Sequence, residues 1–184
     1  MSEPHRTERL DLHVMTAPFL EASLAGDLEG AGRLIDAVVP PDWLESREFM
    51  QLRLRRMRED PAFEDWGPRA VVLRAEARMV GHAGFHTPPG AEYLAPYAPG
   101  GVEMGYTVFA SDRRRGYATE AVAGLMVWAR ERGISRFVLS IAPTNDASLA
   151  VARRLAFTGP VATVEDEEDG PEDIYVRGDR VAQG

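Results

Sequence analysis

The sequence contains no cysteine, and all 21 residues in its Lys and Arg total are arginines. Without cysteine the chain has no disulfide framework, no thiolate zinc site and no cysteine nucleophile. The absence of lysine has an equally good explanation in genomic codon bias, so it carries no functional prediction. Covalent thiol catalysis is therefore excluded before any motif is considered.

Long apolar runs are also missing, since none approaches the roughly 20 residues that a membrane-spanning helix needs. Residues 1–15 mix acidic with basic side chains and lack the apolar core of a secretory signal. The charged fraction of 27% and the apolar fraction of 45% are typical of a soluble globular protein. We therefore expect a cytoplasmic protein with no membrane partner.

Positive charge is the minority sign, because the formal net charge is -8 at pH 7. A nucleic-acid footprint needs a net basic face, which an acidic surface opposes. We therefore expect no nucleic-acid partner, and the acidic balance favours cationic molecules instead.

No linker rich in Pro, Gly or Ser divides the chain, so residues 1–184 are expected to form a single domain. Apolar periodicity predicts an α/β fold. The expected strands are Arg9–Val14, Ala70–Arg74, Met79–Phe85, Val102–Phe109, Phe137–Ile141, Val161–Val164 and Ile174–Val176. The expected helices are Ala17–Gly26, one or two within Asp42–Arg58, one with the apolar face Ala118, Ala121, Val122, Leu125 and Trp128, and Asp146–Leu155. Residues 88–101, PPGAEYLAPYAPGG, are predicted to be a long surface loop.

The most informative stretch is VFASDRRRGYAT, residues 108–119, which runs from a strand through a cationic turn into a helix. The first N–H groups of a helix have no intrahelical partner, so with added positive charge they make a site for a diphosphate. Gly116 lets the backbone approach the phosphates, and Ala118 keeps the next turn narrow. The residues expected to bind the phosphates are Arg113, Arg114, Arg115, Gly116, Tyr117, Ala118 and Thr119. Alone, such a turn is also typical of a plain basic helix start.

With PTNDAS and RRLAF following it, this stretch resembles the cofactor half of the GNAT family of N-acetyltransferases. The resemblance is clearest over residues 102–157, and TERLDLHVM and PTNDAS are most similar to the ribosomal-protein acetylating branch. It implies a mixed, strongly twisted sheet flanked by helices, with a splay between the family's fourth and fifth strands. It also implies acetyl-CoA as co-substrate, no metal, and acetyl transfer to an amine by direct attack in a ternary complex. Homodimers are common in that family.

The resemblance assigns roles to three further residues. The exposed main-chain groups of Val108 would bind pantetheine in the splay, and a backbone N–H would meet the thioester carbonyl. Asn145 would hydrogen-bond pantetheine, although a helix cap alone explains it equally well. Ser148 or a water would donate a proton to the departing thiolate, because Ala152 stands where many relatives carry a tyrosine.

Glu103, on the strand leading to Val108, is the carboxylate best placed to deprotonate the attacking amine, directly or through a water. Strand alternation puts it on the face of Gly105 and Thr107. A cross-strand ion pair is the structural alternative for this residue. His82 and His86 share a strand face but make a poor metal site without a third ligand, and a packed or substrate-facing role is expected.

The acceptor is left open between a protein N-terminal α-amine and a small cationic amine. The acidic run Glu165–Asp169 could attract a cation, although a solvated loop explains such a run as well. A non-catalytic acyl-CoA-binding module is the alternative from another functional class.

Overall fold

The structure is a computed structural model that describes residues 3–166 and 170–178. Its centre is an eight-stranded mixed sheet in the order β1-β2-β3-β4-β5-β6-β8-β7. The strands are β1 (His5–Arg6), β2 (Leu10–Val14), β3 (Pro68–Leu73), β4 (Arg78–Phe85), β5 (Val102–Val108), β6 (Arg136–Ile141), β7 (Thr158–Asp166) and β8 (Gly170–Gly178). The α-helices are α1 (Ala17–Leu24), α2 (Leu28–Ile35), α3 (Arg47–Glu59), α4 (Tyr117–Arg130) and α5 (Asp146–Arg154).

The predicted parallel pair is present and forms a splay. Strands β5 and β6 are parallel neighbours, and α4 is the crossover between them. Their register covers only Val102↔Phe137 and Glu103↔Val138, so the two strands separate beyond that point. The other strand pairs in the sheet are antiparallel. The mixed sheet and the splay expected from the sequence are thereby confirmed.

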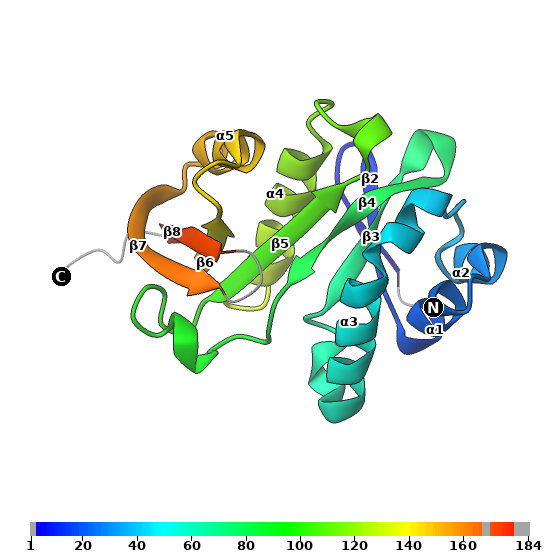
Figure 1. Ribbon diagram of the computed structural model, residues 1–184, viewed down its shortest axis with the longest axis horizontal. Coiled ribbons are helices and arrows are strands. Elements are labelled where there is room, and N and C mark those ends of the chain that lie inside the picture. The colour runs from blue at the N-terminus through cyan, green and yellow to red at the C-terminus, as the bar shows by residue number, and fades with distance from the viewer. Residues whose placement is uncertain (1–2, 167–169, 179–184) are drawn as a thin grey trace.

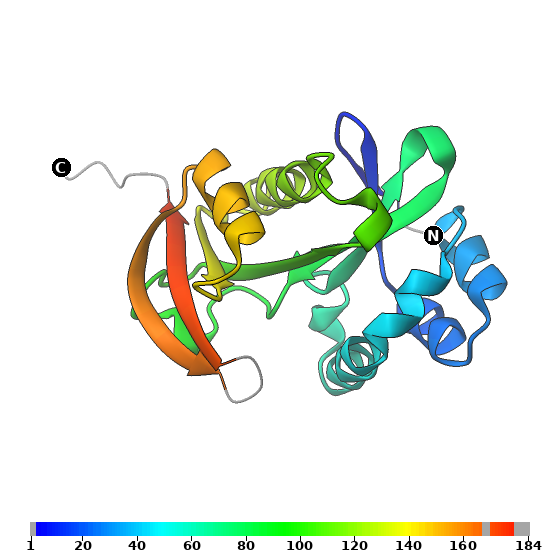
Figure 2. The same cartoon turned by 45° about the horizontal axis from the view of Figure 1, so that its top comes forward.

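Helices cover both faces of the sheet, with α4 and α5 on one face and α1, α2 and α3 on the other (Figures 1 and 2). Each layer encloses its own apolar core. The core under α4 contains Val122 and Leu125 against Phe85 and Phe137, all at most 1% exposed. The core under α1–α3 is centred on Trp43, which is fully buried. No helix in the described part of the chain is long and apolar enough to cross a bilayer.

Local signals explain where several helices begin. Thr16 caps α1 by accepting a hydrogen bond from the Phe19 N–H, and Asp27 caps α2 by accepting one from the Gly30 N–H. The short strand β1 and helix α2 were not expected from the sequence. The predicted strands around residues 161–164 and 174–176 are present but longer, as the hairpin β7–β8.

The prediction that residues 88–101 form only a surface loop is wrong in part. The segment contains a short 3₁₀ helix, Glu92–Leu94, and both Leu94 and Ala98 are only 2% exposed. They pack against Val138 and Ile174 in a small core of their own. Two buried apolar side chains therefore fix a segment whose Pro and Gly content suggested an unpacked loop.

Candidate active site

The turn between β5 and α4 has the geometry of an anion site. Arg114 and Gly116 have positive φ values of 63° and 83°, and Gly116 is the N-cap of α4 without any side-chain cap. Within the described residues, no N–H group from Arg114 to Thr119 donates a hydrogen bond to the protein. A row of free main-chain donors at a helix N-terminus, flanked by three exposed arginines, suits a diphosphate.

Two ion pairs hold this turn in place. Asp112, only 1% exposed, accepts two hydrogen bonds from Arg78 of β4 at 2.8 and 3.0 Å. Arg9 donates to the Arg115 carbonyl at 3.1 Å and to Glu120 of α4 at 2.7 Å. The Arg9 guanidinium also lies 4.8 Å from the centre of the Tyr117 ring, which is buried. The predicted residue Tyr117 can therefore offer only its backbone to a cofactor.

The free edge of β5 faces the splay. In the antiparallel ladder with β4, the Phe109 N–H donates to the Val80 carbonyl and the His86 N–H donates to the Glu103 carbonyl. Ladder bonds alternate along a strand, so the main-chain groups of Tyr106 and Val108 point away from β4. The Val108 carbonyl accepts a hydrogen bond from Arg113 Nε at 3.1 Å. The Val108 N–H has no partner in residues 3–166 and 170–178, so it can donate to a ligand in the splay.

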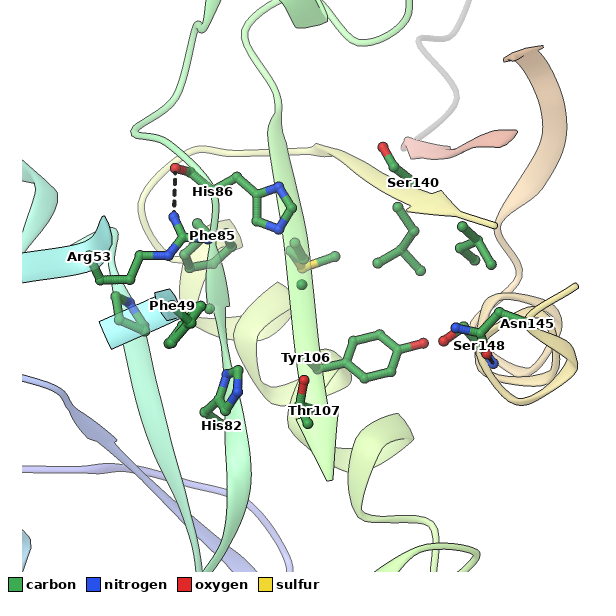
Figure 3. A pocket seen from close by; sticks show the side chains of 16 residues that line it. Phe49, Arg53, His82, Phe85, His86, Tyr106, Thr107, Ser140, Asn145 and Ser148 are labelled. Atoms are coloured by element: carbon green, nitrogen blue, oxygen red, sulfur yellow. Dashed lines mark hydrogen bonds between the residues drawn. The ribbon is translucent and has the colours of Figure 1, made fainter. Parts of the chain in front are cut away.

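Helix α5 forms the far wall of the splay. Asn145 caps it, because its Oδ1 accepts a hydrogen bond from the Ser148 N–H at 3.0 Å. Both residues line the same cavity as Tyr106, whose hydroxyl points across the splay toward Ser148 (Figure 3). That hydroxyl is buried and has no hydrogen-bond partner within the described part of the chain. Burial raises the pKa of Tyr106, and the nearby Ser148 hydroxyl opposes this rise.

A cavity of about 360 Å³ connects the splay to helix α3. One end of it is lined by Asn145, Ser148 and Tyr106, and the other by Phe49 and Arg53 of α3. His86 and Gly105 line its middle. The cavity therefore joins the splay to helix α3 and has polar side chains at both ends.

Glu103 lies beside the middle of this cavity and is 6% exposed. It accepts hydrogen bonds from Tyr93 Oη at 2.7 Å and from Ser140 Oγ at 2.5 Å, and its Oε2 lies 3.4 Å from His86 Nδ1. Burial would raise the pKa of Glu103, but the bonds and charge of His86 and the two hydroxyl donors lower it to about 2. The carboxylate is thus ionised and surrounded by donors at neutral pH.

His86 is held over the cavity by this carboxylate. Nδ1 faces Glu103, whereas Nε2 lies over Gly105, where an added Cβ would come within 2.5 Å of that nitrogen. Figure 3 shows the ring projecting from the end of β4 over β5, with one nitrogen directed into the cavity. Only glycine at position 105 leaves room for this ring. Because Glu103 and Gly105 lie on the same face of β5, as predicted, the carboxylate of one and the missing side chain of the other together position His86.

His82 has a different environment from His86. It is 7% exposed and stacks on Phe49 with ring centres 4.3 Å apart. Burial, together with the positive charge of Arg53, lowers the pKa of His82 to about 4. Among the described residues there is no group of three His, Asp or Glu side chains that could hold a metal ion.

The predicted acidic run falls partly outside the described residues. Glu165 lies in β7, while residues 167–169 are outside the described part of the chain. Its expected role toward an acceptor therefore stays a prediction.

Three residues of the site, two that line the cavity and Tyr93 that holds Glu103, were not found by sequence reasoning. Arg53 comes from a helix that reads as an ordinary surface helix, and Tyr93 comes from the segment predicted to be a loop. Tyr106 follows Glu103 by three positions, so strand alternation puts it on the other face, and only the splay lets it reach the cavity. None of these three residues belongs to a motif that the sequence alone would reveal.

Comparisons with known proteins identify the family of the chain. A family model described as an acetyltransferase (GNAT) domain matches residues 16–158. The uncharacterised N-acetyltransferase YjdG of Bacillus subtilis (strain 168) is 26% identical over 156 residues, covering 82% of this chain and 87% of that protein.

Solved structures share the fold at low sequence identity. An acetyltransferase from Agrobacterium tumefaciens str. C58 is similar with a TM-score of 0.62 and 22% identity, over 97% of this chain and 96% of that one. RimL, a ribosomal L7/L12 α-N-protein acetyltransferase, in complex with coenzyme A has a TM-score of 0.64 and 21% identity, over 96% of this chain and 98% of its own.

Proposed function

The chain belongs to the GNAT family of acetyltransferases and is an acetyl-CoA-dependent acetyltransferase, and we propose that it transfers the acetyl group directly to a primary amine in a ternary complex. The observation that carries this proposal is the row of free N–H groups at the start of α4, which opens beside the splay. We assign the diphosphate to residues 113–119 and pantetheine to the free edge at Val108, with Asn145 on the opposite side.

Amine deprotonation is the costly preparatory step. An amine attacks a thioester only when neutral, and a lysine side chain would need about 4.6 kcal/mol to deprotonate at pH 7, against about 1 kcal/mol for an α-amine. We assign this proton to the pair formed by His86 and Glu103. Glu103 is a weak base because His86, Ser140 and Tyr93 stabilise its charged form. It therefore orients His86, whose Nε2 faces the cavity and receives the proton, directly or through a water.

The leaving thiolate is a weaker base than the amine, so its protonation is the easier step. We assign it to Ser148, as the sequence suggested, with the Tyr106 hydroxyl as its neighbour in the splay. A backbone donor that stabilises the developing oxyanion is typically worth about 2.7–4 kcal/mol. The Val108 N–H is free for that contact.

The RimL neighbours are described as acting on the α-amine of a ribosomal protein, which favours an α-amine acceptor for this chain too. The test is release of coenzyme A from acetyl-CoA with a panel of N-terminal peptides, amino acids and polyamines, together with calorimetry of coenzyme A binding. We expect micromolar-range binding and turnover with at least one α-amine. Binding without turnover on any amine would contradict the catalytic proposal, and no binding at millimolar coenzyme A would contradict the cofactor site.

A further inference from the structure

Arg53 is a buried cation at the acceptor end of the cavity. It comes from α3, is 7% exposed, and lines the cavity together with Phe49 and His82. The one hydrogen bond of its guanidinium joins Nη1 to the His86 carbonyl at 3.3 Å (Figure 3), and its Nε has no partner within the described residues.

Arg56 already satisfies the carbonyl that Arg53 contacts. Its Nη1 donates to the same His86 oxygen at the shorter distance of 2.9 Å. Within residues 3–166 and 170–178, no carboxylate lies within 4.0 Å of either guanidinium. The acceptor end of the cavity therefore carries two neighbouring positive charges without a matching acid.

A buried cation without a carboxylate partner is costly to the fold. Arg69 is a buried arginine that serves packing. Its Nε also has no partner among the described residues, but its Nη2 donates to the Asp65 carbonyl at 2.8 Å, it lies 4.4 Å from the Trp128 ring centre, and it does not line the cavity. Arg53 also stacks on an aromatic ring, 5.0 Å from the centre of Phe49, but it does so at the cavity wall. Because Arg53 lies at the cavity wall, an anionic ligand in the cavity can supply the negative charge that the protein does not.

The charge of Arg53 persists at neutral pH. Burial, and then the neighbouring Arg56, lower the pKa of Arg53 to about 10, while Tyr93 and Glu103 oppose this shift. The guanidinium thus stays protonated across the physiological range. Glu103 does not neutralise it at contact distance, because that carboxylate is engaged by Tyr93, Ser140 and His86.

We propose that Arg53, supported by Arg56, binds an anionic group of the acceptor, a carboxylate or a phosphate carried by the same molecule as the reacting amine. The acceptor's amine lies at His86 and its anion at the guanidinium, with Phe49 and His82 as the wall between α3 and β4. Acceptors with an acidic group close to the α-amine fit this arrangement. A purely cationic polyamine does not, because it would place like charges together at Arg53.

This inference rests on the proposed acetyl transfer, so binding and turnover are measured separately. Calorimetry on the protein loaded with coenzyme A compares matched ligands: α-amino acids and short peptides with a carboxylate near the amine, their amides, an aminoalkyl phosphonate, and spermidine. Release of coenzyme A with the same ligands reports catalysis. A protein that binds the anionic ligands selectively without turning them over supports the anion subsite and contradicts only the acetyl-transfer proposal.

Three variants make the test specific. Arg53→Met keeps the length of the side chain but removes its charge, and Arg53→Lys keeps the charge without the planar fork. Arg55→Met is the matched control, since Arg55 is an exposed arginine of the same helix. Thermal unfolding of each variant checks its folding, and Arg53→Lys keeps the test valid where Arg53→Met does not fold.

We expect the wild-type protein to bind the anionic member of a matched pair at least about tenfold more tightly than its amide. Arg53→Met should abolish this preference, Arg53→Lys should retain part of it, and Arg55→Met should leave it unchanged. Stronger binding of amides or of spermidine by the wild type would overturn the proposal. So would an unchanged preference in a folded Arg53→Met or Arg53→Lys protein.

Discussion

At the scale of single residues, the environment of Glu103 decides what that carboxylate can do. Three donors from different elements surround it, and its charged form is stabilised so strongly that it holds a proton poorly. A group with so low a pKa suits orientation of its neighbour better than proton abstraction. His86 is the neighbour whose second nitrogen reaches the cavity.

Variants of this pair separate positioning from direct base catalysis. Glu103→Gln should slow acetyl transfer by about 10²-fold while coenzyme A affinity stays within twofold, because the proton path is lost but the cofactor turn is not. His86→Gln should cost a similar factor and flatten the rise of the rate with pH. The double variant should be no slower than the slower single variant, since both residues act on one proton.

Glu92→Gln, at an exposed acid in the neighbouring segment, is the control and should behave as the wild type. If His86→Gln keeps full activity while Glu103→Gln loses acetyl transfer, Glu103 itself is the base. If the factors by which the two single variants slow acetyl transfer multiply in the double variant, the two residues have independent roles.

At the scale of elements, the turn before α4 and the one after α5 use the left-handed backbone region differently. Gly116 adopts a φ of 83° without a side-chain penalty, whereas Ala156 adopts a φ of 55°. A non-glycine residue in this region is strained. The two positions therefore have opposite expected responses to exchange of glycine and alanine.

Ala156→Gly should stabilise the protein by about 0.5–1 kcal/mol, because relief of strain exceeds the added entropy of the unfolded chain. Gly116→Ala should destabilise it by about 1 kcal/mol and weaken coenzyme A binding, since a side chain is strained at a φ of 83° and relief of that strain would distort the turn. Urea unfolding and calorimetry measure both effects. Equal stability of Ala156→Gly and the wild type would show that the turn is not strained.

Most elements were predictable because their signals are local. Residues 108–119 combine a strand, a positive-φ glycine and an apolar helix face in one continuous stretch, and the structure follows that pattern. Helix α2 was missed because Gly30 and Gly32 lower its helix propensity. Both glycines make room for the ends of the helix itself: a Cβ at Gly32 would lie 2.5 Å from the Ala37 carbonyl oxygen, and a Cβ at Gly30 would lie 2.1 Å from Asp27 Oδ2.

At the scale of the whole molecule, the free energy of unfolding should fall in two separate pH ranges as the pH is lowered. The pKa of His82 is lowered to about 4, so the unfolded chain binds the proton first and stability falls as the pH drops from about 6.5 toward 4. The pKa of Glu103 is lowered to about 2, and those of Asp112 and Glu120 are also lowered, so their contribution is full above about 4.5 and is lost below it.

Free energies of unfolding in urea at pH 7, 5 and 3 measure both steps. His82→Phe should remove much of the loss between pH 6.5 and 4, which is up to about 3 kcal/mol for a shift of this size. Glu103→Gln should keep that upper step and reduce the lower one. A pH dependence of His82→Phe identical to that of the wild type would contradict the assignment to the buried imidazole.

The cavity as a whole could not be read from the sequence. His86 meets Glu103 through the register of β4 against β5, and Arg53 reaches the same space from α3, more than thirty residues before His86. Contacts of this kind depend on how the helices pack on the sheet, and the local pattern of apolar residues does not predict that packing. The sequence predicted the cofactor half, whose residues are contiguous, and left the acceptor half undetermined.

The connection between β1 and β2, residues 7–9, supports the phosphate-binding turn directly. Thr7 and Arg9 grip Glu120 and the Arg115 carbonyl from more than a hundred positions away in sequence. Trimming the chain up to Arg9 or fusing a sequence beside it would therefore disturb nucleotide affinity before it affected the acceptor end of the cavity.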